Sequence, residues 1–326
     1  MQKGAVKYIK GLDTIRAVAI FFVILEHWGP YFAKGTTPYY FLHIPVSGGL
    51  FGVNMFFVLS GFLITSILLN DKLKYEGDNR LVLVKNFYIR RSLRIFPIYY
   101  LVIFYSLFTN FDIVYPNLAY FLTYTSNVLH YRANVPTYLS YTWSLAVEEQ
   151  FYLIWPWVIV FTSLKNLKYV IGGFILMGLL SKAFVIFVLH HQYAALMINC
   201  TDFFGIGALY ALYRLNAEGC ARFERFFITL LPVLLFLSWR LAPLSGTAGG
   251  ALLVFVTTLF ITLAPIVFVL KNRSAWVRTY LLENPVAVYV GKISYGLYLF
   301  HMPVGIAVNR LITAHFSGTL LANYNV

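Results

Sequence analysis

The sequence contains few charged residues and especially few acidic ones. Of its 326 residues, 11% are charged and 60% are hydrophobic, and 12 Asp and Glu stand against 25 Lys and Arg. Soluble globular domains are about 45–50% apolar and about 25% charged. The composition therefore excludes an ordinary soluble domain. It predicts an all-α, polytopic integral membrane protein.

Cysteine is also scarce. The two cysteines, Cys200 and Cys220, lie at or near a predicted span and a cytoplasmic loop, which indicates ordinary small residues rather than a disulfide. No HExxH motif and no clustered set of cysteines and histidines occurs, so we expect no metal cofactor. A convergence of two intramembrane histidines with a pair of glutamates is the one arrangement that leaves metal binding open.

The net charge of +13 comes from Lys and Arg in short loops between apolar runs. This is the distribution that the positive-inside rule describes, and it argues against nucleic acid as a partner. The most basic segment, residues 70–94, holds seven Lys or Arg and is predicted to be cytoplasmic. The basic N-terminus is predicted to be cytoplasmic as well. It is not expected to be a signal peptide, because no small-residue cleavage site follows Trp28 and Arg16 interrupts the apolar run.

The apolar runs predict one transmembrane domain over residues 1–326, made of about ten helices without a linker or internal repeat. Segment 117–130 is too short to cross a hydrocarbon core of roughly 30 Å comfortably, so we expect a re-entrant or interfacial helix there. In the second predicted span, small residues such as Gly52 and Gly61 favour close contact between helices. Apart from segment 117–130, the predicted spans are 12–28, 48–69, 95–110, 145–163, 169–189, 200–213, 226–240, 250–270 and 293–313.

The first predicted span, 12–28, carries Arg16, Glu26 and His27. A charged side chain at the bilayer centre costs at least about 2.5–3.5 kcal/mol, so ionisable groups in a span are candidates for function. Eleven helical steps place Arg16 and His27 roughly 16 Å apart along the axis and on nearly the same side of the helix. We expect Arg16 near the cytoplasmic end and His27 near the outer end.

Arginines also gather at the start of the third span. Arg91 and Arg94 lie three residues apart on one predicted helical face, and Arg90 precedes them. Together with Arg16 they could form a cationic mouth for a phosphorylated ligand, because guanidinium groups bind phosphate in a bidentate way. Snorkelling anchors at the membrane interface are the alternative.

Three further polar positions stand next to apolar helices. Glu148 and Glu149 follow Trp143 at the predicted outer start of a helix, which is typical either of a sugar-facing or proton-handling site or of acidic residues that complement a helix dipole. Asp202 is expected to cap a helix. His301, in the last apolar helix, is either a site residue or a buried histidine bonded to a backbone carbonyl.

Taken together, these stretches resemble the acyltransferase 3 family of bacterial integral membrane proteins, which O-acylate surface carbohydrates. The resemblance is carried by five ordered motifs over nearly the whole chain. They are Arg-x10-His at Arg16 and His27, FGVNMFFVLSGFLI (51–64), Arg-x-x-Arg at Arg91 and Arg94, WSLAVEEQFY (143–152) and ISYGLYLFH (293–301).

The resemblance implies transfer of an acyl group, usually acetyl, from cytoplasmic acyl-CoA to a hydroxyl of a carbohydrate or glycolipid, such as a lipopolysaccharide O-antigen or exopolysaccharide unit. It associates Arg16, Arg91 and Arg94 with the acetyl-CoA donor and His27 with catalysis. It also implies a multi-pass protein of the bacterial cytoplasmic membrane, in contact with membrane lipid. Some members carry an extracytoplasmic domain, and we expect none fused to this chain.

The expected mechanism uses His27 as a general base on the acceptor hydroxyl, with a covalent acyl-histidine as the less economical route. Glu148 or Glu149 would orient His27 or bind the sugar; we expect Glu148 to be the catalytic one, and Glu149, Trp143 and His301 to bind the acceptor. A proton-coupled transporter with Arg16, Glu148 and His301 as its relay is the competing class, although inverted repeats were not found. A structural membrane subunit is disfavoured by the concentration of charge in the spans. The oligomeric state is left open.

Overall fold

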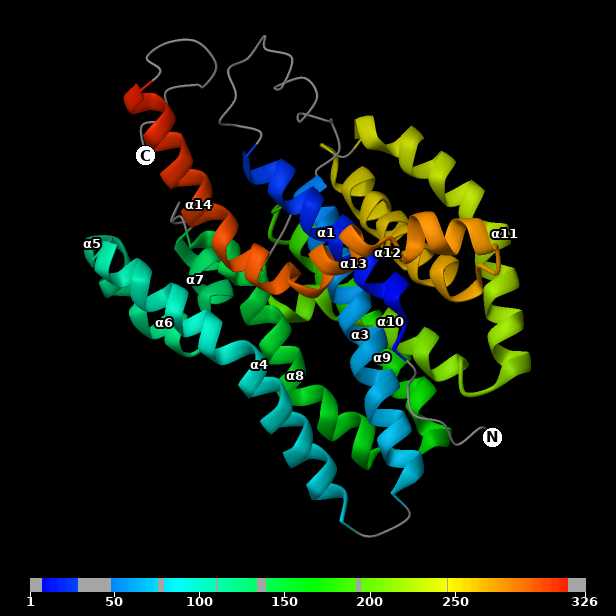
Figure 1. Ribbon diagram of the computed structural model, residues 1–326. Helices are drawn as coiled ribbons and strands as arrows, with labels where there is room; N and C mark the ends of the chain where they lie inside the picture. Colours follow the sequence, from blue (N-terminus) through cyan, green and yellow to red (C-terminus); the bar gives the residue numbers. More distant parts are fainter. Residues whose placement is uncertain are drawn as a thin grey trace. The chain divides into compact units, whose positions relative to one another are not determined.

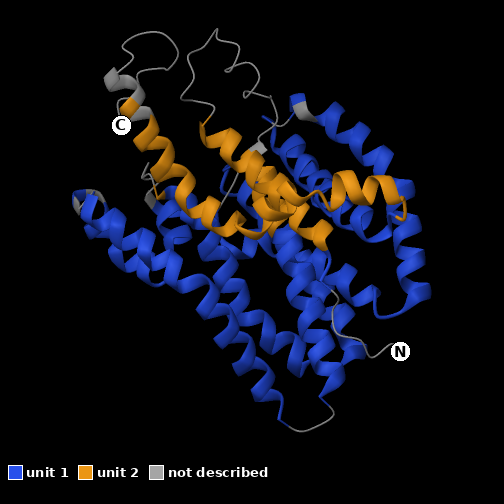
Figure 2. Cartoon of the chain, viewed as in Figure 1, with its two compact units in different colours: residues 1–9, 57–136, 140–272 blue, residues 10–56, 137–139, 273–326 orange. Residues whose placement is uncertain are grey.

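The computed structural model describes residues 8–28, 48–75, 79–109, 111–133, 139–191, 195–244 and 246–315. Within these ranges every regular element is a helix and no strand occurs, as the composition predicts. The chain forms two compact units, which Figure 2 shows in different colours. Unit 1 comprises residues 1–9, 57–136 and 140–272, and unit 2 comprises residues 10–56, 137–139 and 273–326.

Helix α3 (Gly48–Lys74) contributes its first residues to unit 2 and the rest to unit 1. The other elements, of which Figure 1 labels the α-helices, each lie in one of the two units that Figure 2 colours. Unit 2 contains α1 (Lys10–Trp28), the π-helix η6 (Val277–Leu282), α13 (Pro285–Lys292) and α14 (Ser294–His315). Unit 1 contains α4 (Arg80–Thr109), α5 (Phe111–Val114), η2 (Tyr115–Asn117), α6 (Leu118–Leu122), α7 (Ser126–Ala133), η3 (Ser140–Thr142), α8 (Trp143–Phe161), α9 (Leu164–Phe187), η4 (Met197–Cys200), α10 (Thr201–Tyr213), α11 (Ala217–Leu241), η5 (Ala242–Leu244) and α12 (Ala248–Lys271).

Among the described residues, four helices are long and apolar enough to cross a membrane by length and composition: α3, α4, α9 and α12. Their bounds agree with the predicted spans, except that α4 begins at Arg80, well before the expected residue 95. Helix α10 has 13 residues, or about 20 Å of helix, so the prediction that 200–213 is a span of its own is not supported.

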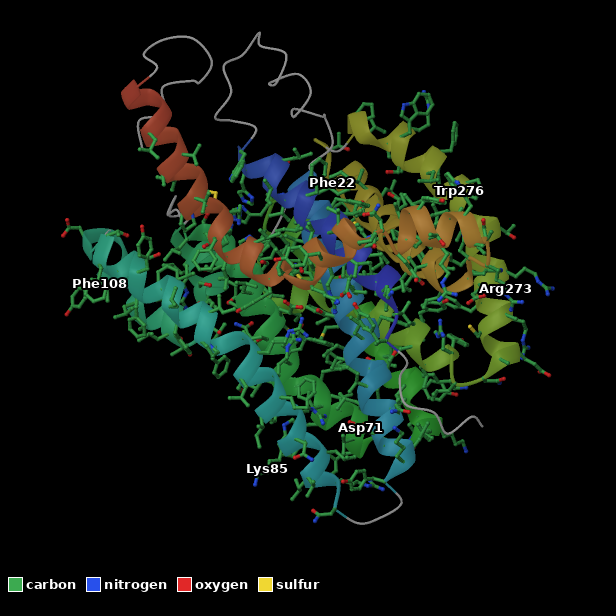
Figure 3. All side chains as sticks on the ribbon, viewed as in Figure 1. Phe22, Asp71, Lys85, Phe108, Arg273 and Trp276 are labelled. Carbon is green, nitrogen blue, oxygen red and sulfur yellow. The ribbon has the colours of Figure 1, made fainter. Side chains whose placement is uncertain are left out.

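Beyond Arg94, the exposed face of α4 is mostly apolar, and Leu93 just before it is exposed as well. Leu93 is 73% exposed, Leu101 58% and Phe108 85%. Figure 3 shows Lys85 near one end of this helix and Phe108 projecting from the other. An exposed apolar face along a 30-residue helix is what contact with lipid requires.

The interior of unit 1 is built on close helix contact and stacked aromatic rings. A methyl group on Gly61 of α3 would collide with the Phe204 carbonyl of α10, and one on Gly207 of α10 would collide with the Val58 carbonyl of α3. This confirms that small residues in the second span permit close approach. The Phe204 ring in turn stacks on Phe151 of α8, with ring centroids 4.1 Å apart.

Two basic segments lie at the same end of unit 1. The Lys72 ammonium of α3 donates to the backbone carbonyls of Ile159, at 2.8 Å, and of Thr162, at the C-terminus of α8. The last carbonyls of a helix lack intrahelical partners and carry the negative end of its dipole, so a cation is favourable there. The loop after α8, which leads to Lys165 and Lys168, therefore lies beside the end of α3, as the distribution of basic residues predicts.

Segment 117–130 is not one helix. Helices α6 and α7 are separated by a turn in which Tyr124 has a φ of 53°. The Tyr99 hydroxyl of α4 donates to the Phe121 carbonyl at 2.9 Å, and the Tyr100 hydroxyl donates to the Leu122 carbonyl at 3.1 Å, so carbonyls at the end of α6 are satisfied. The segment is therefore two short helices rather than one continuous span-length helix, and its re-entrant or interfacial placement stays a prediction.

In unit 2, α13 packs against α1 (Figure 1). A methyl group on Gly291 would collide with the backbone carbonyl of Asp13. The Thr14 hydroxyl donates to the Leu282 carbonyl at 2.7 Å, at the end of the π-helix. The α1 backbone is therefore fixed by elements that lie more than 260 residues further along the chain.

Candidate functional site

The candidate residues fall into two polar clusters, one in each unit. Unit 2 holds Arg16, His27 and His301, and unit 1 holds Arg91, Arg94, Trp143, Glu148 and Glu149. Each cluster combines residues from several helices.

Arg16 forms an ion pair within α1. Its guanidinium donates to the carboxylate of Asp13, three residues earlier. The Asp13 side chain is 3% exposed and that of Arg16 is 22% exposed, so the pair lies at the edge of the unit's interior. Our sequence interpretation did not include Asp13, although an acid three residues before a basic residue on a helix is a recognisable signal. Among the described residues, Asp13 is bound by one of the five N–H donors that a guanidinium offers.

His27 and His301 meet in unit 2. Nδ1 of His27 lies 3.2 Å from Nε2 of His301, and the ring centroids are 4.9 Å apart. Nδ1 of His27 is also 2.9 Å from the Val23 carbonyl, one turn earlier on α1. The sequence singled out both histidines, and the structure joins them. The expected bond from His301 to a backbone carbonyl is confirmed at Tyr298, 2.6 Å away.

Trp28 fastens α1 to α14 beside this pair. Its indole N–H donates to the His301 backbone carbonyl at 3.0 Å. A methyl group on Gly305 would lie 2.7 Å from the indole nitrogen, so glycine leaves the room that the ring occupies. Glu26 is directed elsewhere, because its carboxylate accepts a hydrogen bond from the Gly49 N–H at 3.4 Å.

The cluster in unit 1 is centred on Glu148. Its carboxylate accepts hydrogen bonds from the Ser60 hydroxyl of α3 and the Tyr152 hydroxyl of α8. The Arg91 guanidinium of α4 lies 3.9 Å from the same carboxylate and 3.9 Å from the Tyr152 ring centroid. We call Ser60, Arg91, Glu148 and Tyr152 the Glu148 cluster.

The surroundings of the Glu148 cluster bear on two alternatives left by the sequence: whether the glutamates complement a helix dipole, and whether Arg91 is an interfacial anchor. Glu148 and Glu149 lie in the second turn of α8, whose first turn contains no acidic residue, so the dipole-complement interpretation is wrong. Arg91 faces Glu148 and Tyr152 inside the unit rather than snorkelling to an interface, whereas Arg94 is exposed. Ser60 and Tyr152 were not predicted as site residues. Ser60 lies within the motif FGVNMFFVLSGFLI, and Tyr152 is the last residue of WSLAVEEQFY.

Trp143 and Glu149 lie on the same helix without joining the Glu148 cluster. The Trp143 ring stacks on His130 of α7, with centroids 6.3 Å apart, and meets Phe57 edge to face at 6.2 Å. In the described part of the chain, Glu149 makes no hydrogen bond or ion pair.

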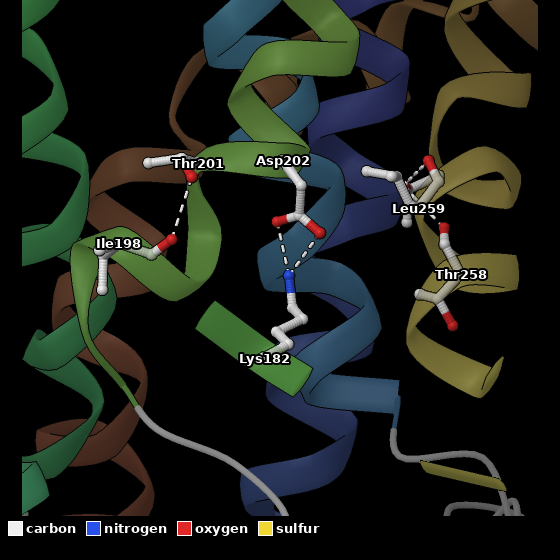
Figure 4. A network of polar contacts seen from close by, with 7 residues as sticks. Lys182, Ile198, Thr201, Asp202, Thr258 and Leu259 are labelled. Atoms are coloured by element: carbon white, nitrogen blue, oxygen red, sulfur yellow. Dashed lines mark hydrogen bonds and ion pairs between the residues drawn. The ribbon is translucent and has the colours of Figure 1, made fainter. Parts of the chain in front are cut away.

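A buried ion pair in unit 1 was missed by the sequence interpretation. Lys182 of α9 donates to both carboxylate oxygens of Asp202 at 2.5 Å, as Figure 4 shows. The two side chains are 4% and 0% exposed. Asp202 therefore pairs with a lysine, and α10 has no side-chain cap. The lysine inside the apolar run 169–189 was the signal that could have indicated this pair.

No group of three or more His, Cys, Asp and Glu side chains gathers into a possible metal site among the described residues. The convergence of two histidines with the glutamate pair, which would favour a metal, is not found within either unit.

Comparison with known proteins places these residues in context. The family model described as an acyltransferase domain matches residues 9–323. The peptidoglycan O-acetyltransferase OatA of Listeria monocytogenes is 29% identical over 345 residues, which cover 91% of this chain and 49% of the relative. A putative O-acetyltransferase of Staphylococcus aureus is 29% identical over 339 residues, covering 91% and 51%. The putative peptidoglycan O-acetyltransferase YrhL of Bacillus subtilis is 28% identical over 347 residues, covering 91% and 49%. The chain thus spans about half the length of these curated relatives. No solved structure matches it.

Proposed function

We propose, from the premise that this chain belongs to the acyltransferase 3 family, that it is a membrane-bound O-acetyltransferase. It moves an acetyl group from cytoplasmic acetyl-CoA to a hydroxyl of a carbohydrate or glycolipid. The observation that carries the proposal is the fixed imidazole of His27, which bonds to Val23 and His301 in a helix whose sequence is otherwise mostly apolar. An imidazole with an ordinary pKa near 6.5 can accept a proton at neutral pH.

We assign the donor phosphates of acetyl-CoA to Arg91, Arg94 and Arg16. Guanidinium groups match phosphate oxygens in a bidentate geometry and stay charged at any physiological pH. The contact with Glu148 and Tyr152 supports this role for Arg91, because it holds a long side chain in one orientation before the donor arrives. Glu148 then acts in catalysis by holding Arg91.

We assign the acceptor to Glu149 and Trp143. An aromatic face and a carboxyl group are typical groups of a carbohydrate site. Glu149 lies six residues, about 1.7 helical turns, beyond Trp143 on α8, and Trp143 is partly exposed. Two of the relatives described above are named for peptidoglycan, which supports a polymer of the bacterial cell surface as the acceptor class. Within this class of acceptor, a lipopolysaccharide O-antigen or exopolysaccharide unit is the alternative to peptidoglycan.

In the proposed reaction, His27 removes the proton of the acceptor hydroxyl as its oxygen attacks the thioester carbonyl. A carbon–oxygen bond forms, the carbon–sulfur bond breaks, and the CoA thiolate leaves. The proton on the imidazole is then available to the thiolate. Neither metal nor redox chemistry is needed for this balance.

We further propose that the chain is a bundle of about ten membrane helices in the bacterial cytoplasmic membrane, with its N-terminus in the cytoplasm. The four long apolar helices support this arrangement. So does the contact of Lys72 with the end of α8, because it puts two basic segments at one end of unit 1.

The test is transfer of label from radioactive acetyl-CoA to a cell-surface glycan by the purified protein in detergent. Substitution His27→Ala should lower kcat by about 10²–10⁴-fold, the usual contribution of a general base. His191→Ala, which changes an exposed histidine in the loop after α9, is the matched control and should leave kcat unchanged. Full transfer by a correctly inserted His27→Ala protein would refute the role of His27.

The acceptor is identified by comparing the surface glycans of a deletion strain and its parent by mass spectrometry. In the deletion strain, the carbohydrate that the enzyme modifies should be lighter by about 42 mass units, which is the mass that one acetyl group adds. If the protein transfers no label to any glycan but moves protons across the membrane of vesicles, the result would favour the proton-coupled transporter instead.

A further inference from the structure

We infer that His301 is a positioning residue: its Nε2 atom holds His27 in the tautomer that leaves the lone pair of His27 Nε2 free to accept a proton. The inference rests on the proposed function, in which His27 is the general base. It gives His301 a role different from the acceptor binding that the sequence predicted.

The protonation of the His301 ring follows from its neighbour. Nδ1 of His301 lies 2.6 Å from the Tyr298 carbonyl oxygen. A carbonyl oxygen can only accept a hydrogen bond, so Nδ1 of His301 must carry the hydrogen. In a neutral imidazole only one nitrogen is protonated, and Nε2 of His301 therefore presents a lone pair. That lone pair faces Nδ1 of His27 at 3.2 Å.

The protonation of the His27 ring follows in the same way. Its Nδ1 has two neighbours that can only accept, the Val23 carbonyl at 2.9 Å and the Nε2 lone pair of His301. In the opposite tautomer, Nδ1 of His27 would carry a lone pair that faces the lone pairs of the Val23 carbonyl oxygen and of His301 Nε2. Nδ1 of His27 therefore carries the hydrogen, and its Nε2 carries the lone pair. Among the described residues Nε2 of His27 has no hydrogen-bond partner, and the side chain is partly exposed.

The surrounding packing holds the two rings in this relation. His301 is 3% exposed, so its ring cannot exchange partners with bulk water. The indole of Trp28, the residue after His27, donates to the backbone carbonyl of His301 at 3.0 Å. Adjacent residues of α1 are thus bonded to the same residue of α14. This two-point contact fixes the distance between the helices at the level of the imidazoles.

The arrangement suits a base that must take and return one proton. When Nε2 of His27 accepts the hydroxyl proton, Nδ1–H keeps both of its acceptors and the new imidazolium stays in place. The proton then leaves from the same Nε2 to the CoA thiolate. The function of His301 is the one that a carboxylate performs in other catalytic histidine pairs, namely to select the tautomer and orient the ring.

The tautomer can be measured without any substrate. Nitrogen-15 NMR of histidine-labelled protein in lipid nanodiscs distinguishes protonated from unprotonated ring nitrogens, and the His27 signals are assigned by their loss in His27→Gln. We expect protonated Nδ1 and unprotonated Nε2 for His27 in the unmodified protein. Substitution His301→Phe, which removes the acceptor but keeps a ring, should produce a population with Nε2 protonated.

A matched variant separates positioning from packing. His301→Gln offers a side-chain carbonyl oxygen near the former Nε2, so it should keep the His27 tautomer and most of the activity. His301→Phe should lower kcat by about 10–100-fold with an unchanged KM for acetyl-CoA, the size of effect seen when a partner that orients a functional histidine is lost.

Either of two results would overturn the inference. One is a His27 that is protonated at Nε2 in the unmodified protein, a measurement that needs no variant. The other is a folded His301→Phe protein in which the tautomer and kcat are both unchanged. Failure of the proposed function looks different, because His27→Ala would then retain transfer activity whatever tautomer the NMR spectra report.

Discussion

Lys182 and Asp202 form a buried ion pair between α9 and α10, in which one ammonium donates to both carboxylate oxygens at 2.5 Å. Their side chains are 4% and 0% exposed. Breaking such a pair by removing one partner leaves an uncompensated buried charge and typically costs about 3–5 kcal/mol. The main effect of the pair on stability is therefore that losing one partner leaves the other as an unpaired buried charge.

Substitution Lys182→Met should accordingly destabilise the protein by about 3–5 kcal/mol, and Asp202→Leu by a similar amount. The double variant should recover most of the loss, because it leaves no buried charge. Thermal unfolding in detergent measures all three. Lys165→Met, at an exposed position of the same helix, is the control and should change stability by less than about 0.5 kcal/mol. A double variant as unstable as the single ones would contradict the ion-pair explanation.

Gly291 is predicted to be the least tolerant glycine of unit 2. Because an added methyl group would collide with the Asp13 carbonyl, Gly291→Ala must move α13 away from α1. Overpacking of this kind costs about 1–3 kcal/mol. Gly296→Ala, on the neighbouring helix α14, meets open space and should not destabilise. The melting temperatures of the two variants in detergent provide the comparison, and equal values would show that the close approach is unimportant.

Arg91 should determine donor affinity if it binds a phosphate of acetyl-CoA. Loss of a charge-assisted hydrogen bond costs about 1.5–3 kcal/mol, so Arg91→Ala should raise KM for acetyl-CoA by roughly 10–100-fold. Arg91→Lys should recover little, because an ammonium cannot reproduce the planar stack on Tyr152. The control is Arg90→Ala. The Arg90 side chain is exposed, with its Nη2 atom 3.4 Å from Oδ2 of Asp71, and an exposed ion pair of this kind contributes little. Calorimetry of acetyl-CoA binding that gives equal affinities for Arg90→Ala and Arg91→Ala would remove Arg91 from the donor site.

Cys220 is predicted to react slowly with alkylating reagents. It lies in the first turn of α11, next to the basic loop, and its thiol donates to Glu224 at 3.3 Å. Burial, together with this hydrogen bond, raises the pKa of the Cys220 thiol to about 11. Only the thiolate reacts, so at pH 8 roughly 0.1% of the thiol is in the reactive form.

The rate of iodoacetamide labelling of Cys220 should therefore rise about tenfold per pH unit from pH 8 to pH 10. A Cys200→Ala background removes the other thiol of the chain. Glu224→Gln should speed labelling at pH 8, because it removes a negative charge that disfavours the thiolate. A rate that levels off near pH 8.5 would contradict the raised pKa.

Local patterns were sufficient for much of the fold. The helix positions were predicted to within a few residues for α1, α8, α9 and α12, because each is an apolar run bounded by charged or turn-forming residues. The break between α6 and α7 was anticipated only as a segment too short to cross. The π-helix and α13 were not predicted, because their sequences carry neither a long apolar run nor a distinctive motif.

The sequence by itself determined the class of the protein and its family. Few charges, basic loops and five ordered motifs are properties of composition and spacing, which do not depend on how helices pack. Only the tertiary structure decided the partners: His301 for His27, Ser60 and Tyr152 for Glu148, and Lys182 for Asp202. Partners of this kind depend on which helix faces meet, and His27 and His301 meet although 274 residues separate them. A buried polar group requires a partner, and the fold alone determines which residue supplies it.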